Sequence, residues 1–385
     1  MVIQGKQIDN KKIPLLVNDF VIREDICNSR CEYCLIGDSS IKEDRSVKRT
    51  NGIVRFDPKK IKEPLLYQPG TPLKIRIDKV LNIMEDYTHT SILKISGGEV
   101  FLIKNIIGLL EDRHTHYSNV QVLTNGTLLN REIVKRLADI PSMNVQFTID
   151  GHTLEMNSYR VKTQTLQDKL MKNLDLLIEY KIPVEINCVL TNKNTENLDK
   201  FVEYLLRYEG KLILLPYPVR GTAKSKYFPL PEQLKGIEKL IENYTLYQGV
   251  LPPLIYLSSL LEYLIRRKRV LKCSLPLCMF QLFDDGIITP CVNMWTVILG
   301  NILNEKPEPV FDKIGKEKIY NLMLTDEPST PFCKQCFTPW DVINLYFQGE
   351  IPLEVLCEMP LYAKEEIKKK LERLKEITIE RGGKK

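Results

Sequence analysis

The sequence predicts an α/β fold: a partial (β/α)6 TIM-like barrel followed by a small C-terminal α+β domain. Between Ile75 and Leu215, short apolar runs rich in Val and Ile alternate with amphipathic helical segments. Short buried strands that alternate with helices are typical of parallel βαβ units. Because such crossovers are right-handed, about six of them curl a sheet into a complete or incomplete barrel. A chain of 385 residues has room for this domain and a smaller one.

The first strand is expected over Pro14–Arg23, which is apolar and rich in β-forming residues. Five helix and strand pairs follow it. Their expected bounds are Lys79–Tyr87 with Ile92–Ser96, Ile103–Glu111 with Val120–Thr124, Asn130–Ala138 with Val145–Ile149, Leu166–Tyr180 with Val184–Leu190, and Leu198–Tyr208 with Leu212–Leu215. The polar, basic and poorly periodic segment Gly37–Leu73 is expected to cross the surface as a long loop.

The rest of the chain has a different pattern. Lys224–Arg269 is predicted to be helical with a break at two prolines, and Leu361–Arg381 to be a charged amphipathic helix. Gln281–Phe283 and Ile287–Thr289 flank an Asp-Asp-Gly turn signal and predict a hairpin. The expected division is an N-terminal extension (1–13), the barrel (14–223), a helical linker (224–270), the α+β domain (271–360) and a C-terminal helix (361–385).

The composition excludes some classes of function. Lys and Arg outnumber Asp and Glu by 55 to 49, so the formal charge is only +6 and no nucleic-acid partner is expected. No run of about 18 apolar residues predicts a membrane span. Met1–Lys12 lacks an apolar export segment, so we expect a cytoplasmic protein without a membrane partner. In that compartment ten cysteines serve as metal ligands or reactive thiols rather than disulfides.

Three of the cysteines form a compact motif after the first strand. Cys27, Cys31 and Cys34 have the spacing C-x3-C-x2-C. Three thiolates at this spacing can hold a four-iron cluster and leave one iron free to bind a ligand. The alternatives are a zinc site or buried structural cysteines. A structural zinc site takes four ligands, and no fourth Cys or His lies nearby in the sequence, so the spacing favours the iron–sulfur cluster.

Polar and glycine-rich motifs follow the next three predicted strands. They are Ser96–Glu99, Thr124–Gly126 and Thr148–Gly151. Barrel enzymes bind their ligands at this edge of the sheet. The two glycines of the first motif let a ligand approach the backbone closely. Turn chemistry or helix capping explains Thr124 and Asp150 equally well, so both explanations stay open for them.

These motifs resemble those of radical S-adenosylmethionine (SAM) enzymes. In that family the three cysteines, here Cys27, Cys31 and Cys34, hold a 4Fe–4S cluster whose open iron binds the amino and carboxylate groups of SAM. An injected electron breaks the sulfonium bond and releases a 5′-deoxyadenosyl radical. The resemblance runs from about Pro14 to Cys357. It implies an enzyme with a 4Fe–4S cluster and SAM as cofactors.

The resemblance also implies which residues contact SAM. Tyr33 matches an aromatic position near the adenine, and Gly97, Gly98 and Glu99 match a motif that contacts the amino group. Arg160 resembles an arginine that pairs with the SAM carboxylate, a role that suits a bidentate guanidinium, although a surface ion pair explains it nearly as well. Further polar positions that would face SAM are Thr124, Asn125, Thr148 and Asp150.

The C-terminal cysteines resemble the auxiliary-cluster extension of this family, which is called SPASM in its full form and twitch in its shorter form. Cys278 and Cys291 bracket the predicted hairpin, and Cys333 and Cys336 follow as C-x2-C. The full form has seven cysteines and two auxiliary 4Fe–4S clusters. This chain departs from it, because residues 337–356 contain no cysteine.

Two ligand sets follow from this departure. In the first, one auxiliary cluster uses four thiolates and the other two are spare. The four are Cys278, Cys291, Cys333 and Cys336, and the spare ones are Cys273 and Cys357. In the second, two clusters share all six cysteines. We favour the first set, and a zinc ribbon with the same four thiolates is the alternative without redox chemistry.

The resemblance favours a peptide substrate, because radical SAM enzymes with this extension mostly modify peptides or proteins. We expect a maturase that cross-links or epimerises a ribosomally synthesised precursor peptide. In an epimerase, Cys273 or Cys357 would be the catalytic thiol that returns a hydrogen atom to the peptide radical. A small-molecule radical SAM dehydrogenase and a non-catalytic iron–sulfur or zinc scaffold are the alternatives.

Partner proteins follow from the same resemblance. Ferredoxin or flavodoxin is implied as the electron donor. Many peptide maturases carry a leader-binding domain before the barrel, whereas only Met1–Ile13 precede the first strand here. We therefore expect a separate leader-binding protein.

Overall fold

The computed structural model describes most of the chain. The described residues are 12–22, 27–34, 47–50, 53–56, 72–221, 224–295, 297–327 and 330–382. Most of the predicted surface loop, Gly37–Leu73, lies outside them. Within that loop an antiparallel ribbon is described, formed by β2 (Val47–Thr50) and β3 (Ile53–Phe56), where the sequence predicted no strand.

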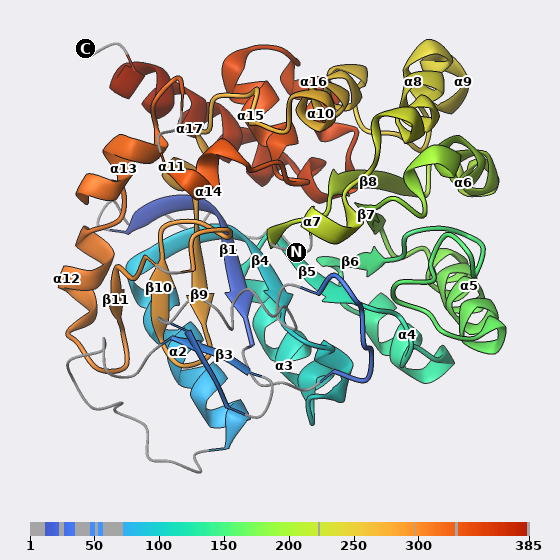
Figure 1. The fold of residues 1–385 in the computed structure, drawn as a ribbon. Helices are drawn as coiled ribbons and strands as arrows, with labels where there is room; N and C mark the ends of the chain where they lie inside the picture. The colour runs from blue at the N-terminus through green and yellow to red at the C-terminus, as the bar shows by residue number, and fades with distance from the viewer. Residues whose placement is uncertain are drawn as a thin grey trace.

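A nine-stranded sheet with the order β11-β10-β9-β1-β4-β5-β6-β7-β8 forms the centre of the molecule (Figure 1). Six of its strands run parallel in the order that successive βα units produce. They are β1 (Ile13–Val21), β4 (Thr88–Ser96), β5 (Asn119–Thr124), β6 (Met143–Thr148), β7 (Val184–Leu190) and β8 (Leu212–Pro218). The predicted α/β fold with a parallel, barrel-like sheet is therefore confirmed.

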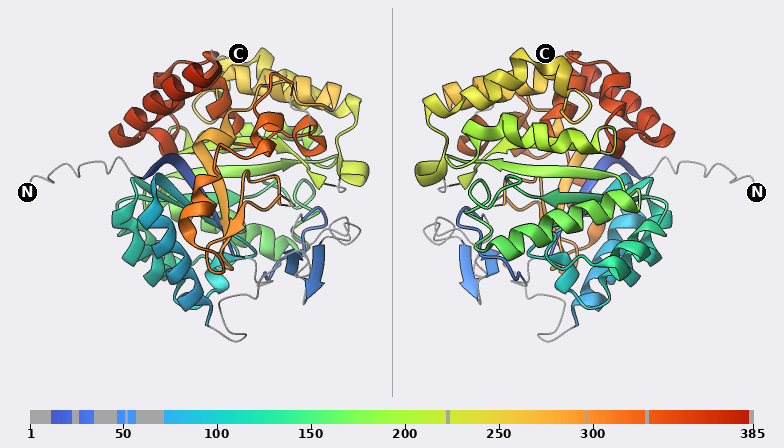
Figure 2. Two further views of the ribbon diagram at one scale, coloured as in Figure 1. Left: turned by 90° about the vertical axis from the view of Figure 1, so that its left-hand side faces the viewer. Right: turned by 90° about the vertical axis from the view of Figure 1, so that its right-hand side faces the viewer.

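Five helices connect these strands and pack against one face of the sheet (Figure 2). They are α2 (Leu73–Tyr87), α3 (Ile106–Arg113), α4 (Arg131–Ala138), α5 (Gln164–Glu179) and α6 (Leu198–Leu205). Local capping explains two of the starts: Asn130 Oδ1 accepts from Ile133 N at 2.9 Å, and Thr163 Oγ1 accepts from Leu166 N at 3.3 Å. Helix α2 starts at Leu73 rather than Lys79, because nothing in that stretch interrupts a helix.

The hairpin of the C-terminal part extends the barrel sheet. Strands β9 (Met279–Phe283) and β10 (Ile287–Thr289) are antiparallel, and β11 (Gly300–Asn301) pairs with β10. Gly286 supports the turn between β9 and β10 with φ +83°. Because β9 also pairs in parallel with β1, the hairpin lies beside the first strand of the barrel. The division of the chain into domains stays a prediction.

Further helices lie in the C-terminal half. They are α7 (Lys224–Tyr227), α8 (Lys235–Glu242), α9 (Tyr244–Tyr247), α10 (Leu254–Arg266), α11 (Leu275–Cys278), α12 (Pro307–Asp312), α13 (Lys318–Met323), α14 (Pro331–Lys334), α15 (Asp341–Gln348), α16 (Leu353–Cys357) and α17 (Glu365–Gly382). Short 3₁₀ turns are η2 (Val100–Leu102), η3 (His114–His116), η4 (Thr195–Asn197), η5 (Leu206–Tyr208), η7 (Pro231–Gln233) and η8 (Pro360–Tyr362). Within the described ranges, none of the helices has the length and apolar character that crossing a bilayer requires.

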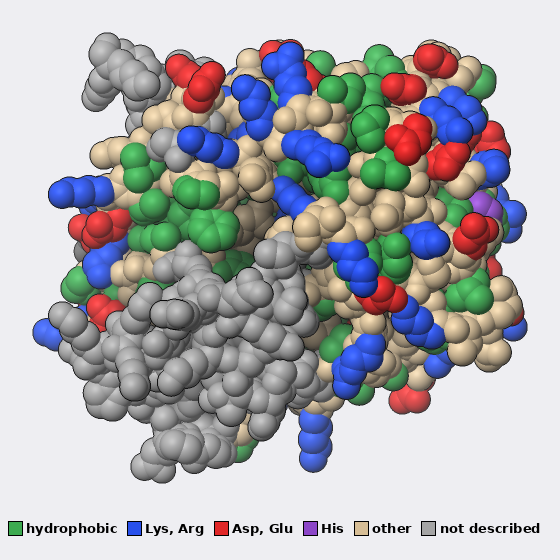
Figure 3. All heavy atoms as spheres, viewed as in Figure 1, with side chains coloured by type: hydrophobic (Ala, Val, Ile, Leu, Met, Phe, Trp, Pro, Cys, Tyr) green, Lys and Arg blue, Asp and Glu red, His purple; other side chains and the backbone are tan. Residues whose placement is uncertain are grey.

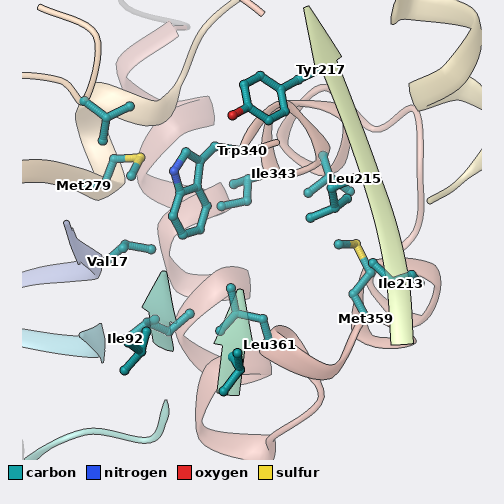
Figure 4. Packing of buried hydrophobic residues seen from close by; sticks show 14 of the residues in the cluster. Val17, Ile92, Ile213, Leu215, Tyr217, Met279, Trp340, Ile343, Met359 and Leu361 are labelled. Atoms are coloured by element: carbon teal, nitrogen blue, oxygen red, sulfur yellow. The ribbon is translucent and has the colours of Figure 1, made fainter. Parts of the chain in front are cut away.

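Apolar side chains of the C-terminal part fill one end of the barrel interior. Figure 4 shows Trp340, Ile343 and Leu361 on the side of the C-terminal helices, across from strand residues that include Val17 and Ile92. All five are buried in one continuous core. In β1 and β4 these apolar residues precede the polar residues nearer the carboxyl end. The carboxyl ends of the strands are therefore the end at which a ligand can enter.

Candidate active site

A cavity of about 660 Å³ lies at the carboxyl ends of the parallel strands. Its lining includes residues of β1 and β9, the cysteine loop (27–34), the ends of β4 to β8, and the segment 338–340 before α15. This volume is in the range of cavities that bind small molecules. The cavity lies where the sequence analysis expected a ligand.

The three cysteines of the first motif form one wall of this cavity. Cys27, Cys31 and Cys34 all line it and are half-buried. The N–H of Cys34 donates to Cys31 O at 3.2 Å, and the N–H of Ser29 donates to Cys27 Sγ at 3.4 Å. Burial raises the pKa of the Cys27 thiol, and the hydrogen bond from Ser29 opposes this rise. Because burial favours the neutral thiol, metal binding is what would stabilise a thiolate here.

The three cysteines provide the number of thiolates that a four-iron cluster with one open iron requires. Among the residues that the structure describes, no three Cys, His, Asp or Glu side chains gather around one point as a single metal ion requires. In a 4Fe–4S cluster each thiolate binds a different iron, so the sulfurs face a common volume without converging. Cys27, Cys31 and Cys34 would hold three irons, and the cavity leaves space for a ligand on the fourth.

Asn125 at the end of β5 fixes the start of the cysteine loop. Its amide nitrogen donates to Asn28 Oδ1 and to Ser29 Oγ, both at 3.0 Å, and lies 3.9 Å from Cys27 Sγ. Asn28 donates in turn to Thr127 Oγ1 at 2.8 Å. The loop that carries the first cysteine is therefore held by side chains of the barrel.

Tyr33 fixes the end of the same loop. Its hydroxyl donates to Asp150 Oδ2, and Arg160 Nη1 donates to the hydroxyl oxygen at 3.2 Å. Asp150 Oδ1 accepts from Val189 N at 2.9 Å, so the network reaches β7. Burial raises the pKa of the Asp150 carboxyl, and the Arg160 guanidinium opposes this rise. Tyr33 and Arg160 line the cavity, whereas Asp150 lies behind them and holds them in place.

Glu99 has a similar supporting position. Its carboxylate accepts hydrogen bonds from Thr124 Oγ1 and Asn125 N, both at 2.7 Å, and from Phe101 N at 3.3 Å. Burial raises the pKa of Glu99, and these three hydrogen bonds oppose the rise. Glu99 is only 1% exposed and is not part of the cavity lining. It joins the ends of β4 and β5.

Gly97 and Gly98 form the cavity wall in front of Glu99. Gly97 has φ +154°, and a Cβ atom there would lie 2.5 Å from Ile22 O. Only glycine fits this position without strain, so the backbone itself lines the cavity.

Nine residues were expected to contact SAM. Seven of them line the cavity. They are Tyr33, Gly97, Gly98, Thr124, Asn125, Thr148 and Arg160. The other two, Glu99 and Asp150, lie behind this layer and position it. The sequence motifs thus marked both the lining and its support without telling them apart.

Sequence analysis missed a row of polar side chains at the cavity floor. Gln281 on β9, Asp19 on β1, Lys94 on β4 and Gln121 on β5 are in register across four neighbouring strands. The first three line the cavity. Polar residues at core-facing positions of apolar strands are the signal that could have revealed this row.

The floor contains buried charges with incomplete hydrogen bonding. Asp19 Oδ2 accepts from Gln281 Nε2 at 3.1 Å, and the Lys94 ammonium lies 4.9 Å from the centre of the Trp340 ring. Burial lowers the pKa of Lys94 and raises that of Asp19, and each charge opposes the shift of the other. Asp19 Oδ1, Gln281 Oε1 and Asn187 Oδ1 line the cavity without a hydrogen-bond partner in the described structure. Buried acceptors of this kind are usually satisfied by a ligand or by water.

Electrostatic interactions link the thiols of five C-terminal cysteines. These cysteines are Cys273, Cys278, Cys291, Cys333 and Cys336. Burial raises the pKa of the Cys291 thiol well above its usual value, and Cys273, Cys336 and Cys333 raise it further. Burial also raises the pKa of the Cys278 thiol, and Cys273 is the one cysteine that contributes to this rise. The Cys278 thiol donates a hydrogen bond to Leu275 O at 3.4 Å.

Cys357 is placed differently. Burial raises the pKa of this thiol, and the charged groups that act on it are those of Lys368, Glu354, Glu365 and Glu372 rather than other cysteines. Neither Cys357 nor Cys273 lines the cavity.

A chain of hydrogen bonds connects the cavity with the C-terminal cysteines. Arg220, which lines the cavity, donates through Nη1 to Asn293 Oδ1. The amide nitrogen of Asn293 donates to Cys336 Sγ at 3.0 Å. No sequence motif pointed to Arg220 or Asn293, because their partners are 73 and 43 residues away along the chain.

The fold and the site define a class of protein: a partial parallel barrel with three cysteines that face a cavity at the strand ends. The family model of the radical SAM superfamily matches residues 21–205. The chain thus carries a radical SAM domain, as the sequence resemblance implied. That family implies a 4Fe–4S cluster and SAM as cofactors.

Several curated proteins are similar to the chain. The cysteine-type anaerobic sulfatase-maturating enzyme of Clostridium perfringens is 25% identical over 335 residues, which cover 80% of this chain and 83% of that protein. An uncharacterized protein of Methanocaldococcus jannaschii, MJ0907, is 28% identical over 64% of this chain and 83% of its own length. Neomycin C epimerase of Streptomyces fradiae is 26% identical over 51% of this chain and 54% of its own length.

Solved structures share the fold at lower identity. The structure of anSMEcpe with bound AdoMet has a TM-score of 0.54 at 17% identity and covers 89% of this chain and 98% of that chain. Streptococcus suis SuiB bound to the precursor peptide SuiA has a TM-score of 0.50 at 14% identity, with 83% and 67% covered. These likenesses support the partial barrel.

Proposed function

We propose that this radical SAM protein cleaves SAM reductively and uses the radical to modify a ribosomally synthesised peptide. One observation carries the proposal: the three cysteines and seven expected SAM contacts line a single cavity at the strand ends. Peptide or protein substrates are supported by relatives named as maturases, among them a mycofactocin maturase that is 28% identical over 31% of this chain.

The residues of the cavity have distinct roles in this proposal. Cys27, Cys31 and Cys34 would hold the cluster, which together with SAM supplies the 5′-deoxyadenosyl radical when both are bound. The bare backbone at Gly97 permits close approach of the ligand. Arg160 would pair with the SAM carboxylate, and its contact with Tyr33 holds the guanidinium in position.

The floor residues would face the substrate. Asp19 Oδ1 and Gln281 Oε1 can accept hydrogen bonds from amide N–H groups of a peptide, and Lys94 can donate to a carbonyl oxygen. Trp340 supports the Lys94 ammonium from one side. A peptide bond offers both a hydrogen-bond donor and an acceptor, so it can pair with both the acceptors and the donor on the cavity floor.

The C-terminal cysteines would hold one auxiliary 4Fe–4S cluster. Its four ligands would come from Cys273, Cys278, Cys291, Cys333 and Cys336, whose thiols interact electrostatically with one another. The set favoured from the sequence, which is Cys278, Cys291, Cys333 and Cys336, stays a prediction. A zinc ribbon with four thiolates around one ion is the alternative without redox chemistry, and iron analysis of the protein distinguishes the two.

The position of the cysteines favours cross-linking over epimerisation. Among the described residues, the thiols that line the cavity are those of Cys27, Cys31 and Cys34, which the cluster would occupy. An epimerase needs a free thiol or another hydrogen donor near the peptide radical. Neither Cys273 nor Cys357 lines the cavity, so their role as catalytic hydrogen donors stays a prediction without support from the geometry.

Replacement of Cys31 by Ala tests the SAM-cleaving part of the proposal. We expect the variant to produce no 5′-deoxyadenosine under reducing anaerobic conditions, because one iron loses its thiolate. Cys357→Ala is the control, since it also removes one cysteine thiol but lies outside the cavity lining. Unchanged 5′-deoxyadenosine formation in Cys31→Ala would falsify the proposal.

Incubation with candidate precursor peptides in deuterated buffer tests the reaction type. Cross-linking removes two hydrogens from the peptide, whereas epimerisation introduces one deuterium, and mass spectrometry separates the two. Candidates are short peptides encoded beside this gene. The proposed electron donor, ferredoxin or flavodoxin, and the proposed leader-binding protein can be supplied in the same assay.

A small-molecule substrate is the second candidate. The likeness to neomycin C epimerase, whose name specifies a small-molecule substrate, favours testing it. Aminoglycosides added to the same assay would show it by stimulating SAM cleavage where peptides do not.

A further inference from the structure

A strongly basic segment follows helix α10. Residues Arg266–Lys272 read R-R-K-R-V-L-K, and Arg266, Arg267 and Lys268 are exposed. The helix ends at Arg266, and the left-handed φ of +54° at the next residue, Arg267, turns the chain away from the helix axis. The charges are therefore displayed on a turn rather than spread around a helix.

Hydrogen bonds join this segment to the loop of the C-terminal cysteines. The N–H of Arg269 donates to Lys334 O at 2.7 Å, and Arg269 Nη1 donates to Cys336 O at 3.0 Å. Arg269 also forms a buried ion pair with Asp341, which fixes its position. The exposed Lys334 on α14 lies between Cys333 and Cys336 in the sequence. The basic turn thus adjoins the proposed auxiliary cluster.

We define the basic surface as Arg266, Arg267, Lys268 and Lys334. Arg266 pairs with Glu262 at 2.8 Å, whereas the other three form no ion pair with a carboxylate of the described chain. Phe332, which is 50% exposed, adds an apolar side chain two residues before Lys334 on α14. In Figure 3, Lys and Arg side chains are seen over the region of α10 and α14. Arginine and aromatic side chains are enriched in protein interfaces.

We propose that this basic surface docks an acidic one-electron carrier protein. The inference rests on the iron–sulfur sites of the proposed function and adds the place where the electron enters. The carrier would lose one electron and the protein's cluster would gain it, without any bond being formed or broken. A positive surface attracts a negative carrier and speeds its encounter by about 10- to 1,000-fold at low salt. Proximity to Cys333 and Cys336 places the docked carrier beside a redox centre.

Stopped-flow reduction of the reconstituted protein tests this surface. The probe is reduced flavodoxin, an acidic carrier, and the readout is the loss of iron–sulfur absorbance. The test variant is Lys268→Glu with Lys334→Glu, which reverses two exposed charges without changing an ion pair. The control variant is Lys169→Glu with Lys172→Glu on α5, which makes the same charge change on another exposed face. Sodium dithionite serves as a small reductant that needs no docking surface.

We expect the test variant to slow reduction by flavodoxin about tenfold at low salt, and the control variant by much less. The difference should shrink at 0.15 M salt, where the screening length falls to about 8 Å. Reduction by dithionite should be equal in all three proteins. If the test variant folds poorly, Lys268→Gln with Lys334→Gln should show a smaller effect in the same direction.

The outcomes separate this inference from the proposed function. Absence of any dithionite-reducible absorbance would overturn the iron–sulfur sites themselves, and this inference with them. Normal dithionite reduction with equal flavodoxin rates in both charge variants would overturn the docking surface alone. That second result would also be expected if the basic surface bound nucleic acid or anionic lipid instead.

Discussion

The two cysteine sites of this protein differ in exposure and in how the chain holds them. Cys27, Cys31 and Cys34 are half-buried on a loop beside the cavity. Among the C-terminal cysteines, Cys273 and Cys291 are only 8% and 7% exposed and do not line the cavity. A site with three thiolates beside a cavity can bind a ligand on its open iron, whereas a buried set of four is closed to ligands. Burial thus distinguishes the two sites, and in the proposed function only the first could bind a ligand from the cavity.

Loss of one thiolate from each site should separate their roles most strongly. Cys34→Ala should abolish SAM cleavage. Replacing a residue that only supports a metal ligand typically lowers activity by about 10- to 100-fold, and loss of a ligand itself should cost more. Cys291→Ala should lower the iron content by about four atoms per chain and leave cleavage measurable. Iron analysis and 5′-deoxyadenosine quantification on anaerobically prepared protein are the measurements. Equal loss of cleavage in both variants would contradict the separation.

A methyl group at Gly97 should impair ligand binding at the cavity beside Cys27, Cys31 and Cys34 without affecting the C-terminal cysteines. The Cβ of Gly97→Ala would lie 2.5 Å from Ile22 O, so the cavity wall must shift. We expect SAM affinity to fall about tenfold, which corresponds to about 1.4 kcal/mol. Equilibrium dialysis measures the affinity.

Gly210→Ala is the control for this change. Gly210 also has a positive φ of +71°, but no atom lies within 4 Å of its added Cβ. It should therefore cost about 1–2 kcal/mol of stability through backbone strain without changing SAM affinity. An unchanged SAM affinity in Gly97→Ala would show that the wall does not contact the ligand.

The hydrogen bond from Asn293 to Cys336 should affect the reduction potential of the C-terminal cysteine site and not that of the site beside the cavity. Asn293 donates to Cys336 Sγ at 3.0 Å, and such donors stabilise the more negative, reduced cluster. In Asn293→Ala the potential of the proposed auxiliary cluster should fall by up to about 59 mV, a tenfold change for one electron. Potentiometric titration followed by electron paramagnetic resonance measures it. Asn243→Ala, whose amide bonds to Lys239 O, is the control, and an equal shift there would refute the role of Asn293.

Replacing a residue that is distant from both cysteine sites should have the smallest effect on SAM cleavage and on the iron content. Lys370 on α17 bonds to His89 O at 3.1 Å, and burial lowers the pKa of its ammonium to about 8. Between pH 8 and 10.5 the unfolded chain binds this proton and the folded chain does not, so stability rises with pH in this window. The gain is about 2 kcal/mol at most after allowance for relaxation.

Lys370→Met should remove this part of the pH dependence. Thermal unfolding of the wild type and the variant at pH 7 and pH 10, at one scan rate, gives the difference. SAM cleavage should be equal in both proteins. A parallel pH profile would show that Lys370 keeps its proton in the folded state.

The parts of the fold and of the site that depend on residues close together in the sequence could be predicted from the sequence. Alternating helices and buried strands indicated the parallel sheet, and the spacing of Cys27, Cys31 and Cys34 indicated the cluster loop. The polar floor was not predicted. Asp19 and Gln281 are 262 residues apart, and only the pairing of β9 with β1 brings them together.

The amino-acid sequence by itself determined the order of the βα units, the three-cysteine loop and the glycines of the cavity wall. These features follow from local periodicity and from spacings of a few residues, which the backbone translates directly into geometry. Only the tertiary structure decided that Glu99 and Asp150 support the lining instead of joining it, and that the Asn293 amide donates to Cys336 Sγ. Those positions depend on contacts between distant segments, and the energy of such contacts is set by burial in the folded core.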